Sequence, residues 1–302
     1  MNLHQLRIFV TVAKRGSFSR AAEELHISQP SASIQVADLE RALGVDLFEQ
    51  AGRQIHLTEA GRVLEDYARR ILALTDEARI AVSETAGLRR GHLVVGASPT
   101  PGTYLLPRII AAFQERYPQI SVSLHIAPGT EIGERLMRHE LDLGVIGGKI
   151  HTPGLQAEPL LDDEIVLIAA PTHPLAAVGS ARAMALRDHR VILRVILPER
   201  GSDTRGAIDE ALSDAGQTVT PAMELTGNEA IKEAVAAGLG AALLSRLAAR
   251  AEVAAGRLVV IPIPDLVIRR QFSVVHLKDR RLSQAVRAFT EMLRASVSAA
   301  RA

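Results

Sequence analysis

The spacing of apolar residues along this chain changes once, near residue 90. Before that point apolar positions recur at intervals of three and four, which is typical of amphipathic helices. This spacing predicts a helix at the start of the chain, two short helices between residues 18 and 43, and one long helix over 59–86. After the segment 87–91 (GLRRG), short apolar runs alternate with helical segments. Such alternation predicts an α/β sheet with right-handed crossovers.

Residues 17–40 predict two short helices joined by a tight turn. Ser17 and Ser28 stand where a side chain can accept a backbone N–H as a helix N-cap. Pro30 falls in the first turn of the second helix, where a missing N–H costs nothing. The buried side of that helix is expected to hold Ala32, Val36 and Leu39. Its other side carries short uncharged side chains, which suit the edges of bases in a DNA major groove.

The pattern A-A-x-x-L-x-x-S-Q-P-S-x-S-x-Q-V-x-x-L-E begins at Ala21 and is followed by LGVDLFEQAGRQIHLTEAG. Both stretches resemble the N-terminal domain of LysR-type transcriptional regulators, and the resemblance continues through the whole chain. It implies a winged helix-turn-helix DNA-binding domain (1–58), a dimerising linker helix and hinge (59–90), and a two-lobed α/β effector domain of periplasmic-binding-protein type (91–302). Lobe I is expected at about 91–162 and 268–302, and lobe II at about 163–267.

The resemblance also implies which residues contact DNA. The side chains expected at the bases, or beside them on the same helix, are Ser28, Gln29, Pro30, Ser31, Ser33, Ile34 and Gln35. Arg20 and, in the wing at 52–57, Arg53 are expected to contact phosphates. Gln50 stands where the family usually has an arginine, and Ile34 stands at a position that is often basic. With a net charge of +1, the chain is expected to bind DNA through a local patch and with modest non-specific affinity.

An apolar stripe runs along the long helix that begins after Thr58. Its members, spaced by threes and fours, are Val63, Tyr67, Ile71, Leu74, Ala78 and Val82. A helix packed on its own domain would show a similar stripe. This one is longer than the adjacent domain could cover, which favours pairing with a second copy in a homodimer or homotetramer.

Four loops that follow predicted strands or open predicted helices carry small polar residues. In open α/β sheets, ligands bind beyond the carboxyl ends of strands, where free backbone N–H groups favour a small anion. The residues predicted to bind the effector are Ser98, Pro99, Thr100, Gly129, Thr130, Ser202, Thr204, Asn228 and Glu229, together with Ile146 and Gly147 at the end of the third strand. Serine and threonine are also ordinary helix caps. It is the family resemblance that brings these loops together.

Three features near these loops depart from the simplest pattern. Residues 201–205 (GSDTR) resemble the family's G-S-G-T-R signature, with Asp203 in place of the middle glycine. A carboxylate there could repel an anionic effector or select a cationic group on it. Lys149 could supply a positive partner, although a solvated loop lysine is the commoner case. The near-repeat RVILRVIL at 190–197 predicts either a lengthened strand or a bulge.

Other function classes find little support in the sequence. The chain has no cysteine, its ten histidines show no metal-ligand spacing, and no cofactor motif occurs. Ser98, Asp142 and His151 follow no known triad order, and no G-x-S-x-G surrounds the serine, so we expect no catalytic residues and no enzyme. The N-terminal segment is an amphipathic helix and no apolar run is long enough to span a bilayer, which predicts a cytoplasmic protein.

The expected function is that of a DNA-binding transcriptional regulator whose promoter binding is modulated by a small anionic metabolite. Its expected partners are double-stranded promoter DNA, a small-molecule effector, further copies of the chain and RNA polymerase, with no membrane. The alternative is a cytoplasmic solute-binding protein of the same two-lobed fold without a gene-regulatory role. The N-terminal helix-turn-helix pattern opposes that alternative.

Overall fold

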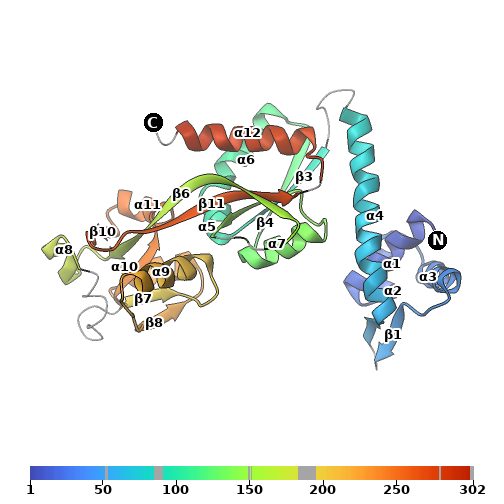
Figure 1. Cartoon of the computed structure of the whole chain (residues 1–302), viewed down its shortest axis with the longest axis horizontal. Coiled ribbons are helices and arrows are strands. Elements are labelled where there is room, and N and C mark those ends of the chain that lie inside the picture. The colour runs from blue at the N-terminus through green and yellow to red at the C-terminus, as the bar shows by residue number, and fades with distance from the viewer. Residues whose placement is uncertain are drawn as a thin grey trace. The chain divides into compact units, whose positions relative to one another are not determined.

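The computed structural model describes residues 1–51, 54–84, 91–148, 150, 152–182, 195–278 and 280–299. The chain divides into two compact units, residues 1–87 and residues 88–302. Arg53, Lys149 and His151, and the first half of the near-repeat at 190–197, lie outside the described residues. The labels used below are those of Figure 1.

The first unit contains three helices, a two-stranded wing and a long helix. Their bounds are α1 (Leu3–Arg15), α2 (Phe18–Glu24), α3 (Gln29–Leu43), β1 (Phe48–Ala51), β2 (Gln54–Leu57) and α4 (Glu59–Glu84). The predicted caps are confirmed: the hydroxyls of Ser17 and Ser28 accept the backbone N–H groups of Arg20 and Ser31. Gly44 ends α3 in the left-handed conformation, with φ of 72°. These residues therefore fix where each helix begins and ends.

The core of the first unit lies on two sides of α1. One cluster joins α1 to α2 and α3 through Ile8, Val12 and Ala32, and the other joins α1 to α3 and α4 through Leu6, Phe9 and Ala68. Leu3 is exposed, whereas Ile8 and Val12 are buried. The buried arc of α1 is wide because other helices pack against it from two directions.

The second unit is built on one mixed sheet of the described strands, in the order β4-β3-β5-β11-β6-β9-β7-β8, with β10 paired to β6. Their bounds are β3 (Gly91–Ala97), β4 (Ile120–Ile126), β5 (Leu143–Gly147), β6 (Leu155–Ala169), β7 (Val195–Pro198), β8 (Met223–Leu225), β9 (Ala241–Ser245), β10 (Val259–Ile261) and β11 (Ile268–Leu277). The pairs within β3, β4 and β5 are parallel, as are those of β7 with β8 and β9. The sheet is mixed because β6 and β11, at its centre, are antiparallel to their neighbours.

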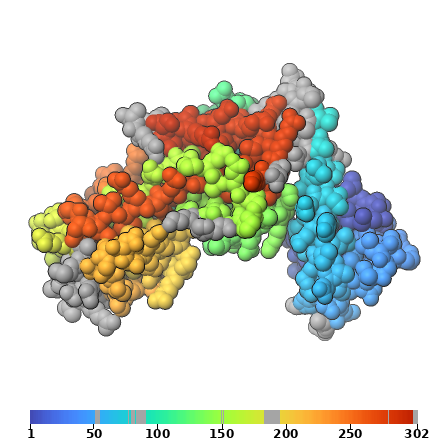
Figure 2. Space-filling view, in the orientation of Figure 1, coloured from blue at the N-terminus to red at the C-terminus, as the bar shows by residue number. Residues whose placement is uncertain are grey.

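Strands β6 and β11 connect the two lobes of this unit. They pair with each other from Ile268 opposite Ile165 to Leu277 opposite Leu155, with one irregularity between Phe272 and Ser273. Strand β6 runs without a break through both lobes, from Leu155 to Ala169. Figure 2 shows β6 in light green and β11 in orange-red lying side by side along the domain.

Helices cover both faces of the sheet in each lobe (Figure 1). Their bounds are α5 (Pro99–Tyr104), α6 (Leu106–Arg116), α7 (Gly129–Met137) and α12 (Gln284–Ala299) in lobe I, and α8 (Pro174–Val178), α9 (Asp203–Asp214), α10 (Asn228–Ala236) and α11 (Arg246–Ala254) in lobe II. Helix α5 begins directly after Ser98 and ends at Tyr104, and α6 begins two residues later at Leu106. Each helix start near the lobe boundary lies beyond a strand end, which is the placement that the sequence indicated for a ligand.

Candidate DNA-binding and effector sites

The outer face of α3 carries the polar side chains that the sequence assigned to DNA. Ser28, Gln29 and Pro30 are exposed at the helix start, and Ser31, Ser33 and Gln35 are partly exposed. The side-chain amide of Gln29 donates to the hydroxyl of Ser33 over 3.0 Å. The structure thus brings the predicted base-facing residues together on one accessible helix start.

Two further residues extend this face in different ways. Ile34 is 58% exposed, and an apolar side chain on a groove-facing helix suits the methyl group of thymine. Arg20 is exposed near the start of α2, where its guanidinium can reach a phosphate. Ala32, Val36 and Leu39 point to the core, so the two sides of α3 are cleanly divided.

The apolar stripe on α4 is exposed. Val63, Tyr67, Leu74 and Val82 are each more than half exposed, and Leu74 reaches 66%. The opposite side of the same helix packs against α1 through Ala68. Within the first unit, therefore, one side of α4 belongs to the core and the other leaves its large apolar side chains open.

A cavity of about 370 Å³ lies between the two lobes of the second unit. Loops from both lobes line it, together with Arg270 on β11. Its lining includes seven of the residues predicted to bind the effector: Ser98, Pro99, Thr100, Gly129, Ser202, Thr204 and Asn228. The convergence that the family resemblance implied is therefore present in the structure.

Arg270 lines this cavity and was not among the residues predicted to bind the effector. It is buried, and its guanidinium donates to the hydroxyl oxygens of Thr100 at 3.0 Å and Thr204 at 2.8 Å. A third hydrogen bond, of 2.9 Å, joins it to the carboxylate of Asp163. The guanidinium carbon also lies 4.9 Å from the centre of the Phe272 ring. The Arg270 cation therefore bonds to the first turn of a helix in each lobe, α5 in lobe I and α9 in lobe II.

The hydroxyl groups of Thr100 and Thr204 are set to donate into the cavity. Each oxygen already accepts from Arg270, and Thr100 also accepts from the amide of Asn228 over 3.4 Å. A hydroxyl has one hydrogen to donate besides the bonds it accepts. Both threonines are buried, so their hydroxyl hydrogens can be given to a bound ligand rather than to bulk water.

Asp203 reaches from the first turn of α9 in lobe II to lobe I. Its carboxylate packs against the start of α7, where a Cβ atom on Gly129 would lie 3.1 Å from each carboxylate oxygen. Burial raises the pKa of Asp203 above its ordinary value, against the opposing effects of the Arg270 charge and of hydrogen bonding with Ser98 and the backbone of Gly147. Oδ2 of Asp203 is buried, and no described residue donates a hydrogen bond to it.

Four predicted residues do not line the cavity. Thr130 is exposed on α7, and Ile146 is buried in the lobe I core. Gly147 contributes through its backbone, since its N–H donates to the hydroxyl of Ser98 over 3.0 Å. Glu229 is held elsewhere, because Lys232 lies 2.9 Å from its carboxylate and the Tyr104 hydroxyl donates to it over 2.7 Å. Tyr104 and Glu229 form a further contact between the lobes.

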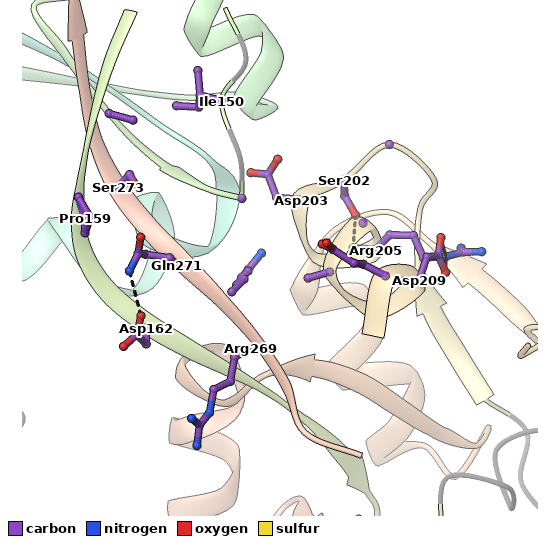
Figure 3. Close-up of a pocket in the computed structure, with 17 residues that line it drawn as sticks. Ile150, Pro159, Asp162, Ser202, Asp203, Arg205, Asp209, Arg269, Gln271 and Ser273 are labelled. Atoms are coloured by element: carbon purple, nitrogen blue, oxygen red, sulfur yellow. Dashed lines mark hydrogen bonds and ion pairs between the residues drawn. The ribbon is translucent and has the colours of Figure 1, made fainter. Parts of the chain in front are cut away.

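A second, more open cavity of about 1050 Å³ lies beside the first one (Figure 3). Gly201, Ser202, Asp203 and Arg270 line both cavities. In Figure 3 the side chain of Asp203 points away from Ser202 and Arg205, across the space between the lobes. Asp203 therefore stands where the two cavities adjoin.

The described residues offer little to a metal ion or a catalytic triad. No group of three or more metal-ligating side chains occurs among them. Asp142 accepts from Arg280 and from the backbone N–H of Val94 in the middle of β3, whereas Ser98 follows the last residue of that strand. Four residues of strand separate these points by roughly 13 Å, so Ser98 and Asp142 cannot act on one atom. None of the described helices combines the length and apolar character needed to cross a bilayer.

Comparison with known proteins decides the family. The model of the lysR-family bacterial regulatory helix-turn-helix protein matches residues 3–62, and the model of the LysR substrate binding domain matches residues 86–298. The chain belongs to the LysR family. It is a DNA-binding transcriptional regulator whose activity is modulated by an effector.

Individual LysR proteins resemble this chain, two of them over nearly its whole length and one over its effector domain. The RuBisCO operon transcriptional regulator of Allochromatium vinosum is 36% identical over 97% of this chain and 95% of its own length. The solved structure of full-length CbnR with its target DNA is 25% identical, covers 98% of this chain and 100% of its own, and has a TM-score of 0.67. The CcmR regulatory domain of Synechocystis PCC6803 in complex with 2-PG is 32% identical, covers 69% of this chain and 98% of its own, and has a TM-score of 0.63.

Proposed function

We propose that this LysR regulator binds promoter DNA through the outer face of α3 and senses a small anionic metabolite in the cavity between its lobes. Residues 1–58 form the DNA-binding domain in this proposal, and residues 59–90 pair two chains. Residues 91–302 bind the effector, with lobe I at about 91–162 and 268–302 and lobe II at about 163–267. The observation that carries the effector site is that Thr100, Thr204 and Arg270 meet around one buried cavity.

The chemistry of the cavity supports an anion. The Arg270 cation lies behind two threonine hydroxyls that can donate hydrogen bonds. Helices α7 and α10 begin at this cavity with Pro128 and Gly227, neither of which caps the helix with a side chain. Their first N–H groups carry the positive end of the helix dipole, which favours a carboxylate or phosphate. Because the similar CcmR domain was solved with 2-PG, 2-PG is the effector that we propose to test first.

DNA binding is proposed to rest on hydrogen bonds from α3 to bases and on a few phosphate contacts. Ser28, Gln29, Pro30, Ser31, Ser33, Ile34 and Gln35 form the proposed base-facing surface, and Arg20 and Arg53 the phosphate contacts. With so few basic residues near α3, a single domain would bind weakly. Pairing through the exposed stripe of α4 supplies a second half-site, so we propose a homodimer or a tetramer built from it.

The remaining partners and properties stay predictions of the family. We propose that the bound regulator acts on RNA polymerase, that it resides in the cytoplasm, and that it has no catalytic activity of its own. These points are consistent with the regulatory name of the relative from Allochromatium vinosum.

The proposal is tested by DNA binding of the full-length protein with and without ligand. Fluorescence anisotropy would compare a duplex from its own promoter region with a scrambled duplex of equal length, in the presence of 2-PG, inorganic phosphate or chloride. We expect a preference for the promoter duplex that 2-PG changes. The variants Gln29→Ala and Ser33→Arg should abolish the preference, whereas Arg41→Ala at the far end of α3 should not. An equal affinity for both duplexes would overturn the DNA-binding proposal.

A further inference from the structure

Asp203 belongs to lobe II by sequence, but its carboxylate is bound by lobe I. It is the first residue of α9, and both of its carboxylate oxygens lie against Gly129 at the start of α7 in lobe I. Ser98 and the backbone of Gly147, at the ends of β3 and β5, oppose the rise of its pKa, and the Gly147 N–H donates to the Ser98 hydroxyl over 3.0 Å. Ser98 is itself 2% exposed, so this contact lies inside the domain.

The surface of lobe I is shaped to receive this carboxylate. A Cβ atom on Gly129, at the start of α7, would lie 3.1 Å from each carboxylate oxygen of Asp203. That separation is too short for an unstrained contact, so the carboxylate packs directly over the glycine backbone. The same Cβ would lie 2.6 Å from a methyl group of Ile146, which leaves glycine as the residue that fits. Asp203 thus occupies a recess at a helix start of lobe I.

The surroundings of the carboxylate are those of an anion-binding site. The carboxylate lies at a helix start without a side-chain cap, and the positive charge of Arg270 and hydrogen bonding with Ser98 and the backbone of Gly147 all favour its ionised form. These are the same kinds of donor that the proposed effector site offers. One oxygen, Oδ2, remains buried without a described donor, so the recess is incompletely matched to this carboxylate. An unpaired buried oxygen weakens the fit relative to a ligand that satisfies both oxygens.

We propose that Asp203 is a tethered anion, which fills the anion-binding recess of lobe I in the effector-free protein and holds lobe II against it. An anionic effector enters that recess only by displacing the Asp203 carboxylate. The aspartate therefore sets the ligand specificity of the cleft. A weakly binding monoanion cannot displace its carboxylate, whereas an anion that makes further contacts in the cleft can. This inference rests on the proposed effector site but not on the DNA-binding proposal.

Replacing the tethered carboxylate with a free one tests the inference. In Asp203→Gly the recess keeps its donors and loses its occupant, so sodium formate should bind there and raise the melting temperature of the full-length protein. We expect a rise of about 3–5 °C at saturating formate, relative to sodium chloride at equal ionic strength. Wild type and Asp214→Gly, which removes an exposed carboxylate at the other end of α9, should show no such rise. Equal stabilisation of wild type, or none of Asp203→Gly, would overturn the inference.

Direct ligand binding gives a second readout that does not depend on the glycine variant folding well. Asp203→Asn keeps the shape of the side chain and removes its charge. Calorimetric titration should show inorganic phosphate binding to Asp203→Asn about tenfold more tightly than to wild type, with Asp214→Asn unchanged. An unchanged affinity in Asp203→Asn would contradict the displacement model. Formate could stabilise Asp203→Gly while no ligand changes promoter binding. That result would disprove the proposed effector role but would still support Asp203 as a tethered anion.

Discussion

The guanidinium of Arg270 lies 2.9 Å from the carboxylate of Asp163, and each side chain is only 3% exposed. The other carboxylate oxygen of Asp163 accepts the Ser245 hydroxyl over 2.7 Å. A buried pair of this kind contributes less by its own attraction than by what its loss leaves behind, namely an unpaired charge in a dry environment. The pair joins the two strands that run from one lobe to the other, since Asp163 lies on β6 and Arg270 on β11.

Removing the cation should destabilise the effector domain strongly. We expect Arg270→Met to lower its apparent free energy of unfolding by about 3–5 kcal/mol, because Asp163 would stay buried without its partner. Arg269→Met is the matched control, since that neighbour is exposed and its replacement should change the value by less than about 0.5 kcal/mol. Urea denaturation measures both. If the two variants lost equal stability, the buried pair would have no special role. Adding Asp163→Asn to Arg270→Met should restore part of the loss.

The hydroxyl groups of Thr100 and Thr204 can be tested by isosteric replacement. Thr100→Val removes the hydroxyl but keeps the shape, so an anionic effector should bind about tenfold more weakly. Thr100→Ser retains the hydroxyl and should bind nearly as well as wild type. Thr103→Val, on the exposed side of α5, serves as the control. Calorimetric titration with 2-PG measures these affinities; equal affinities for the valine and serine variants would remove Thr100 from the site.

The contact between Tyr104 and Glu229 predicts a pH-dependent signal. Burial, and then the hydrogen bond to Glu229, raises the pKa of Tyr104 from 10.0 to about 12. A raised pKa means that the folded state holds this proton more tightly than the unfolded state. The stabilisation is therefore complete below pH 10 and is lost as the pH rises through about 12.

An ultraviolet titration of tyrosinate, read in stopped-flow pH jumps before the protein unfolds, measures this pKa. We expect a step near pH 12 in wild type that disappears in Tyr104→Phe and persists in Tyr117→Phe. Glu229→Gln should lower the midpoint of the step, because an uncharged acceptor favours the protonated phenol less. A midpoint that Glu229→Gln leaves unchanged would show that the two groups do not interact in solution.

The exposed stripe of α4 predicts a concentration-dependent assembly. Leu74 is 66% exposed in the single chain, so Leu74→Glu removes apolar contact area twice in a symmetric pair and adds two charges. We expect the dissociation constant of the dimer to rise on the order of 100-fold. Sedimentation equilibrium measures it, with Asp66→Arg as the control at an exposed position outside the stripe. Identical dissociation constants for both variants would place the contact between chains elsewhere.

The sequence was most informative where one residue type has one local role. Ser17 and Ser28 could be predicted as caps because the unpaired backbone N–H groups of a helix start need such residues, and the structure confirms both. The loops of the cavity could be predicted from strand ends and from the family resemblance. Their meeting depends on long-range pairing of β6 with β11, which no local pattern reports.

Arg270 was missed although a signal was present. Burial alternates along the first residues of β11, with Ile268 and Phe272 inside and Arg269 and Gln271 outside. The period of two therefore places Arg270 on the buried face. An inward arginine is unusual enough to mark a site. Glu229 was assigned to the effector because it begins a helix, but Lys232 stands one turn further along α10 and binds its carboxylate.

The ladder between β6 and β11 limits how the lobes can respond to a ligand. Ten residues of β11 pair with β6 across the boundary between the lobes. A movement that separated the lobes along a straight line would therefore break many backbone hydrogen bonds at once. Twisting the two strands about their common axis changes each bond only slightly, and the irregularity between Phe272 and Ser273 gives the ribbon a local point of compliance. We therefore expect a bound metabolite to rotate one lobe relative to the other about the long axis of the β6–β11 ribbon, rather than to move the lobes apart.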